Sequence, residues 1–81
     1  MRISILHNRD MIYEEEAYQA VLPGEDGEFA MMDFHQPCLY KLQQGRIKIY
    51  VEEKSDDYEN FPITNGIARF RNNELLILCE K

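Results

Sequence analysis

The sequence is poor in cysteine and has no tryptophan. Its two cysteines, Cys38 and Cys79, lie far apart, whereas small secreted domains usually carry a dense disulfide framework. We therefore interpret both as reduced, part-buried thiols. Together with His7 and His35 they offer ligand types that zinc accepts, but none belongs to a paired C-x-x-C or H-x-x-x-H unit. No metal site is expected.

Positive charge is also scarce. Nine Lys and Arg against fifteen Asp and Glu give a net charge of −6, which repels phosphate backbones and anionic lipid surfaces. No apolar run approaches the roughly 20 residues of a membrane-spanning helix, and the start of the chain, MRISILHNRD, turns polar too early for a secretory signal. The pattern predicts a soluble, cytosolic domain that does not bind nucleic acid.

Motifs that carry catalysis are missing as well, because G-x-S-x-G, the P-loop and G-x-G-x-x-G do not occur. Cys38 with His35 is a nucleophile near a base, and a thiol enzyme built on them would need an exposed Cys38 that alkylates quickly at neutral pH. The acidic residues cluster in expected turns, such as the segment 52–57, where a solvated surface is the simpler interpretation. We expect no catalytic residue and no cofactor.

What the sequence does contain is a series of short strands. Apolar and polar residues alternate along 2–6 and 46–51, which is the period of a half-buried strand. Another hairpin is expected around Asn72 and Asn73, since asparagine tolerates the left-handed conformation of a tight turn. No segment has the 3.6-residue period of a helix. The prediction is an all-β fold in a single domain over residues 1–81, a small flattened β-sandwich or barrel of about ten short strands.

The strongest turn signal is LPGEDGEF at residues 22–29. Pro23 fixes its own φ, and Gly24 and Gly27 permit a positive φ, so the backbone can reverse tightly before Phe29.

Other breaks are less sharply marked. Residues 11–21 are interpreted as strand material interrupted around Glu14–Glu16, and Asn65 with Gly66 as a reversal. Pro62 is compatible with a strand only at a sheet edge or a bulge.

The segment that follows the 22–29 turn is unusually apolar for a loop-rich region. Exposed aromatic and methionine side chains often mark protein interfaces, but some of these residues must belong to the core. Both interpretations stay open for Phe29, Met31, Met32, Phe34, Leu39 and Tyr40.

Four motifs agree in order and spacing with one family over nearly the whole chain. They are V-L-P-G-E-D-G-E-F at 21–29, H-x-P at 35–37, L-x-x-G-x-I-x-I at 42–49 and N-G-I-A-x-F at 65–70. With these motifs the chain resembles the N-terminal domain of the epsilon subunit of F-type rotary ATP synthases. The resemblance implies a ten-stranded β-sandwich at the foot of the central stalk, a non-catalytic rotor subunit that couples proton transport to ATP synthesis.

The resemblance also implies partners and contact residues. It places Glu28 and His35 against the c-ring, whose arginine-bearing polar loops a carboxylate and a histidine can meet through charge-assisted hydrogen bonds. It places His7 and the strand with Cys38, Leu39 and Tyr40 toward the gamma subunit. The implied location is peripheral, at the cytoplasmic face of the bacterial inner membrane within the ATP synthase complex.

The chain departs from the family pattern at two places. The family usually has glycine before the loop histidine and a small residue after it, where this chain has Phe34 and Gln36. Many members continue into two C-terminal helices that can inhibit ATP hydrolysis, whereas this sequence stops at Lys81 after the last expected strand. A chain that ends there is expected to lack that kind of inhibition.

The alternative, from a different class, is a free-standing β-sandwich or barrel that carries a small molecule in an apolar cavity.

Overall fold

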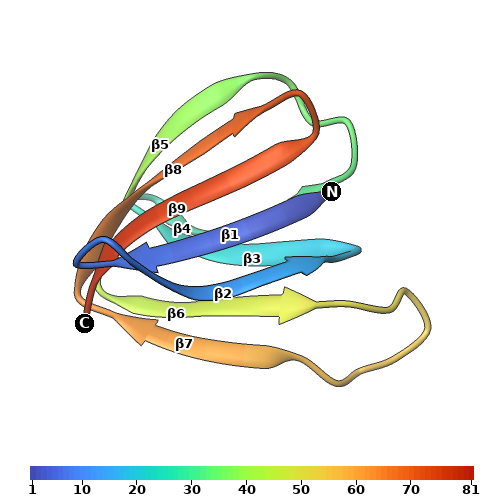
Figure 1. Ribbon diagram of the computed structural model, residues 1–81, viewed down its shortest axis with the longest axis horizontal. Helices are drawn as coiled ribbons and strands as arrows, with labels where there is room; N and C mark the ends of the chain where they lie inside the picture. The colour runs from blue at the N-terminus through green and yellow to red at the C-terminus, as the bar shows by residue number, and fades with distance from the viewer.

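Nine β-strands account for most of the chain in the computed structural model, which describes residues 1–81 (Figure 1). The strands are β1 (Arg2–His7), β2 (Asp10–Glu16), β3 (Gln19–Gly24), β4 (Gly27–Met32), β5 (Cys38–Leu42), β6 (Gly45–Tyr50), β7 (Glu59–Ile63), β8 (Asn65–Arg71) and β9 (Glu74–Glu80). The all-β prediction is confirmed, with nine strands. No helix long and apolar enough to cross a membrane occurs in the structure.

The strands form one curled sheet in the order β2-β1-β9-β8-β5-β3-β6-β7. Strand β4 lies off this path and pairs with β3. The sheet bends sharply between β5 and β3, because these two strands share only the pair Gly24–Leu42. Two halves therefore face each other, β2-β1-β9-β8-β5 and β4-β3-β6-β7 (Figure 1). All pairs are antiparallel except β1 with β9, which bond in parallel and bring the first and last strands together.

Aromatic pairs close both sides of this curled sheet where no hydrogen-bonded ladder does. Tyr13 of β2 and Phe61 of β7 lie with ring centroids 5.1 Å apart, edge to face. Phe29 of β4 and Tyr40 of β5 lie 4.7 Å apart in a tilted arrangement. Because such pairs add to the burial of their own surface, they hold the edges of the two halves together and give the flattened barrel its outline.

The core lies between the two halves. Strict alternation puts Ile3 and Ile5 of β1 inside, and their neighbours on β9, Leu75 and Ile77, are inside with them. These belong to a cluster of sixteen buried residues, all of them apolar. Alternating burial on the central strands is the physical reason that the sequence pattern predicts them so clearly.

Two breaks lie elsewhere than expected. The strand continues through Glu14–Glu16, because β2 is an edge strand and its carboxylates remain in water. The strand ends instead before Ala17, whose N–H donates to the Met1 carbonyl at 2.9 Å. The predicted reversal at Asn65 and Gly66 is also wrong, since both lie within β8.

Glycine is needed at Gly66 for space. A β-carbon there would lie 2.7 Å from the Leu78 carbonyl oxygen of β9. Two other turn predictions are confirmed: Gly27 has φ of +114°, and Asn72 and Asn73 have φ of 52° and 56°. Pro62 lies on β7, an edge strand, as expected.

Candidate protein-interaction site

The chain carries two surfaces that could receive a partner, a cleft between β4 and β5 and the outer face of the β2-β1-β9-β8-β5 half. The β4–β5 cleft has a volume of about 620 Å³ and is lined by Gly24–Ala30, His35 and Leu39–Lys41. It exists because β4 bonds only β3, and β5 meets β3 at Leu42 alone, so the rest of β5 leaves an unpaired edge beside β4. Glu28 and His35, both predicted to contact the c-ring, line this one hollow.

Glu28 is available to a partner. Its side chain is 57% exposed, and its Oε2 lies 3.7 Å from Nζ of Lys48. A surface ion pair of this kind contributes about 0–1 kcal/mol, so an incoming cation can displace the lysine at little cost.

His35 is half-buried and is held from several sides. Its Nδ1 lies 2.8 Å from the Gln36 carbonyl oxygen, and its ring packs edge to face against Phe70 and Tyr40, with centroids 5.7 and 6.4 Å away. The side chain therefore fills the inner end of the cleft and fixes its shape, while Glu28 supplies the exposed charge.

The thiol of Cys38 lies 3.7 Å from Nδ1 of His35. A carbonyl oxygen can only accept, so Nδ1 carries a proton when it donates to Gln36, and it cannot then act as a base toward the thiol. Burial raises the pKa of the Cys38 thiol, partly offset by hydrogen bonds from the Phe70 backbone and Tyr40. The pair therefore lacks the activated thiolate that nucleophilic catalysis needs.

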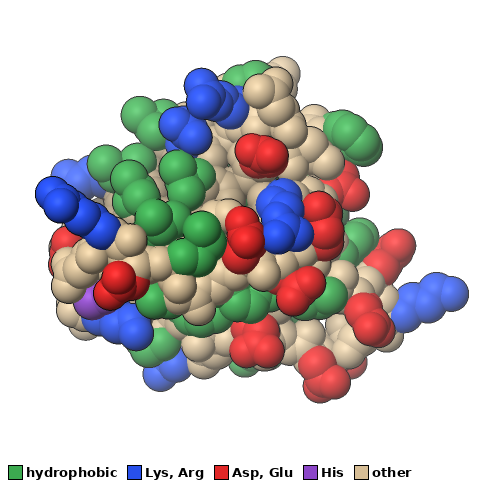
Figure 2. Space-filling model, in the orientation of Figure 1, with side chains coloured by type: hydrophobic (Ala, Val, Ile, Leu, Met, Phe, Trp, Pro, Cys, Tyr) green, Lys and Arg blue, Asp and Glu red, His purple; other side chains and the backbone are tan.

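The second surface is apolar. Register aligns Met11, Leu6, Leu78 and Ile67 across four adjacent strands, and Leu39 of β5 lies diagonally beside Ile67. We call these five residues the apolar row. Four of them are exposed by 46–68% of their surface, with Leu39 the most exposed. Figure 2 shows hydrophobic side chains gathered on this face, over the ends of β8, β9 and β1.

The predicted gamma contacts are divided between the two surfaces. Leu39 belongs to the apolar row. Cys38 and Tyr40 pair with Phe70 and Ala68 and point to the inner side of β5, Tyr40 lining the β4–β5 cleft. His7 pairs with the buried Cys79 and lies at the rim, next to Leu6.

Four members of the apolar row were not predicted as contacts from the sequence: Leu6, Met11, Ile67 and Leu78. A signal for Leu78 is present in the unbroken apolar run from Leu75 to Cys79. A strand that is apolar on both faces is expected to be covered on both, and one face of β9 is covered only by solvent here.

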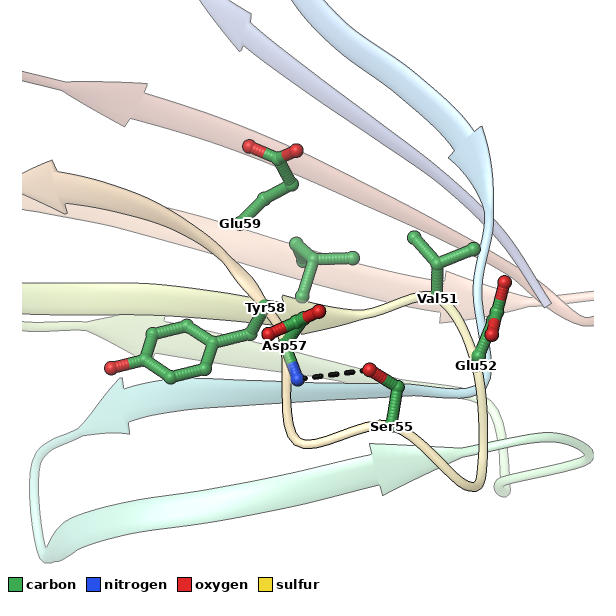
Figure 3. A pocket seen from close by; sticks show the side chains of 7 residues that line it. Val51, Glu52, Ser55, Asp57, Tyr58 and Glu59 are labelled. Atoms are coloured by element: carbon green, nitrogen blue, oxygen red, sulfur yellow. Dashed lines mark hydrogen bonds between the residues drawn. The ribbon is translucent and has the colours of Figure 1, made fainter.

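The hollow between β6 and β7 is acidic, but it does not form a metal site. Glu52, Asp57 and Glu59 line it, and their carboxylates point in different directions (Figure 3). The one hydrogen bond drawn there is from the Asp57 N–H to Ser55 Oγ, at 3.1 Å. No group of three or more His, Cys, Asp or Glu residues anywhere in the chain could hold a metal ion. The segment is the solvated turn that the sequence predicts.

The structure gives no support to the carrier alternative. The space between the two halves is filled by the sixteen-residue cluster. The hollows between β2 and β7 and beside Leu6 measure about 440 and 460 Å³, and both are open to solvent. An apolar ligand site of the carrier type would be enclosed between the halves.

Comparison with known proteins gives one consistent result. A family model described as "ATP synthase, Delta/Epsilon chain, beta-sandwich domain" matches residues 1–81. Among curated proteins, the ATP synthase epsilon chain of Rickettsia bellii is 28% identical over 80 residues, which cover 99% of this chain and 74% of that protein. The epsilon chain of Sulfurimonas denitrificans is 32% identical over 80 residues, 99% of this chain and 60% of that one.

Solved structures with the same fold come from mitochondrial ATP synthases. A chain in the central stalk and c-ring structure from Tetrahymena thermophila has a TM-score of 0.80 at 14% identity, with 99% of this chain and 63% of that chain covered. A chain from the Euglena gracilis enzyme has a TM-score of 0.87 at 15% identity, with 98% and 49% covered. The family model covers the whole sequence, and the chain therefore belongs to the β-sandwich domain family of ATP synthase delta/epsilon chains.

Proposed function

We propose that this chain is a non-catalytic subunit of the central stalk of a rotary ATP synthase, where it binds the gamma subunit and the c-ring and couples proton transport to ATP synthesis. The apolar row is the observation that carries the proposal. A row of large apolar side chains across adjacent strands of a small acidic protein is costly to leave in water, and such patches mark protein interfaces.

The gamma subunit is the partner proposed for the apolar row. Burying an exposed leucine contributes about 1.5–3 kcal/mol when the whole side chain is covered. Leu78 is 49% exposed, so its burial would contribute about 1 kcal/mol, or roughly a fivefold change in affinity. Several such residues in one row would supply most of the binding energy, as hot spots do in other interfaces.

The c-ring is the partner proposed for the β4–β5 cleft. Glu28 offers an exposed carboxylate at the mouth of the cleft, and a partner arginine would bind it in place of Lys48. His35 takes the supporting role, because its ring packs against Tyr40 and Phe70 and keeps the cleft open in one shape. Within this complex the chain would lie peripherally at the cytoplasmic face of the bacterial inner membrane.

The test is to measure binding of the purified chain to gamma and to c-ring in detergent at moderate salt. Leu78→Ser should weaken gamma binding about fivefold and leave c-ring binding unchanged. Glu28→Ala should weaken c-ring binding and leave gamma binding unchanged. Val51→Ser and Glu53→Ala are matched controls, since both residues are exposed in the β6–β7 segment, away from the two surfaces. If the wild-type chain binds neither gamma nor the c-ring, the proposal is wrong.

A further inference from the structure

On the outer face of the β2-β1-β9-β8-β5 half, positive charge is concentrated on β5 and β8. Alternation from the register defines the outward side chains of β5 and β8. They are Leu39, Lys41, Asn65, Ile67, Arg69 and Arg71. None of them is acidic, although the chain as a whole has a net charge of −6. We call the three cations of this set, Lys41, Arg69 and Arg71, the basic strip, which adjoins Ile67 and Leu39 of the apolar row.

Two arginines of the basic strip have no partner within the chain. The structure contains four ion pairs, and neither Arg69 nor Arg71 is in any of them. Arg69 lies across from Leu76, which carries no charge. Arg71 lies across from Glu74, but no guanidinium nitrogen comes within 4.0 Å of the carboxylate oxygens. Both arginines line a hollow of about 180 Å³.

The acidic groups facing that hollow do not neutralise it. They are Glu14 and Glu74, and a third cation, Arg2, lies between them. Glu14 is already paired with Arg2, at 3.2 Å. Three guanidinium groups therefore face two carboxylates, and the surplus of positive charge lies on β8.

We propose that the outer face receives a segment that is apolar at one end and acidic at the other, with apolar side chains over Leu78 and Ile67 and carboxylates over Arg69 and Arg71. This inference rests on the proposed function, in which the segment belongs to gamma. Charge complementarity selects the acidic partner, because arginine binds carboxylates in two-pronged geometry and unpaired cations on an acidic protein attract the opposite sign.

The arginines also set a register. Met11, Leu6, Leu78 and Ile67 lie level with one another near one end of the sheet. Arg69 and Arg71 follow Ile67 along β8 toward the other end, and Leu39 lies level with Arg69. A partner with apolar and acidic residues in that order can bind in one direction only. Reversal would put its carboxylates over Leu78 and leave the arginines desolvated, which is the costly arrangement that gives an interface its specificity.

The experiment compares two double variants that change the net charge by the same amount. R69E/R71E reverses the proposed contacts, and R46E/K54E is the control, since Arg46 and Lys54 are exposed residues of the other half and its loop. For gamma binding at low salt we expect a loss of about tenfold in R69E/R71E and less than twofold in the control. Higher salt should narrow the difference. Circular dichroism should show that both variants are folded.

A second arm does not depend on gamma. A synthetic amphipathic peptide of Leu and Glu and a second of Leu and Lys are titrated into isotope-labelled chain. The acidic peptide should shift the amide signals of β8 and β9 in the wild type and not in R69E/R71E, and the basic peptide should shift neither. If the wild type fails to bind gamma but passes this arm, the proposed function fails and the inference stands.

Other outcomes overturn the inference. Unchanged gamma affinity in R69E/R71E would do so, as would equal shifts with both peptides. Binding of the wild type to vesicles rich in phosphatidylglycerol, lost in R69E/R71E, would assign the strip to a lipid surface instead. A dimer in sedimentation that R69E/R71E abolishes would assign it to a second copy of this chain, whose Glu14 and Glu16 lie on β2.

Discussion

The loop between β4 and β5 holds Phe34 in an unfavourable backbone conformation. Its φ is +63°, in the left-handed region that L-residues other than Asn and Asp avoid. Its N–H donates to Oδ1 of Asn73 at 2.8 Å, which keeps the loop in place. The side chain is 84% exposed, so it gains little from packing.

Phe34→Asn is therefore expected to stabilise the fold. A left-handed L-residue costs about 1–2 kcal/mol, and asparagine relieves part of this cost without the extra chain entropy of glycine. We expect a gain of about 0.5–1 kcal/mol in the free energy of unfolding. In a domain of this size that corresponds to a rise of roughly 3–6 °C in Tm.

The measurement is urea and thermal unfolding followed by circular dichroism. Phe34→Ala is the control, because it removes the same exposed ring and keeps a residue that avoids a positive φ, so its stability should lie close to that of the wild type. If Phe34→Asn is no more stable than Phe34→Ala, strain is not stored at this position. A loss of more than 1 kcal/mol in both variants would mean that the ring packs in solution.

Three further results are expected. Tyr13→Phe should stabilise the fold by about 1 kcal/mol at neutral pH, because the Tyr13 hydroxyl is buried without a partner. Burial, reinforced by nearby carboxylates, raises the pKa of Tyr13 above its ordinary value of 10.0. The folded state therefore favours the neutral hydroxyl, and the free energy of unfolding falls as the pH rises from 10 through the folded-state pKa. Urea titrations should show a smaller fall in Tyr13→Phe. Gly66→Ala should lower the free energy of unfolding by about 2 kcal/mol, since its methyl group would press on the Leu78 carbonyl; an unchanged Tm would contradict the close approach. Cys38 should react slowly with iodoacetamide at neutral pH because of its raised pKa, and a rate above that of free cysteine, followed by mass spectrometry, would reopen the thiol-enzyme alternative.

The sequence predicts the central strands well, because their side chains report burial directly. Ile3 and Ile5 of β1 and Ile47 and Ile49 of β6 point into the core, and the alternation of apolar and polar residues along these strands follows from that. Edge strands are harder to read. The carboxylates of Glu14–Glu16 look like a break, yet this end of an edge strand tolerates them because all three side chains are exposed to water.

The two candidate surfaces can be read from the sequence only in part. The turn that positions Glu28 is visible in the sequence, because Gly27 supplies its positive φ, although Pro23 and Gly24 lie within β3. The role of His35 as the filling of the cleft is not visible, because it depends on Phe70, a residue on a strand far along the chain. The apolar row could not be predicted for the same reason: it is assembled across five strands, and each strand contributes one of its residues.

The parallel pairing of β1 with β9 has a consequence for how the protein is made. Every residue of β1 from Arg2 to His7 has its partner between Glu74 and Cys79, so nearly the whole chain separates the two sides of this ladder. Closing so long a loop is entropically unfavourable and slows folding. On the ribosome β1 would wait, with one edge unpaired, until β9 emerges. The hairpin with β2 pairs the other edge of β1 from the start, and the three glutamates of β2 discourage other chains from adding to the free edge of β2.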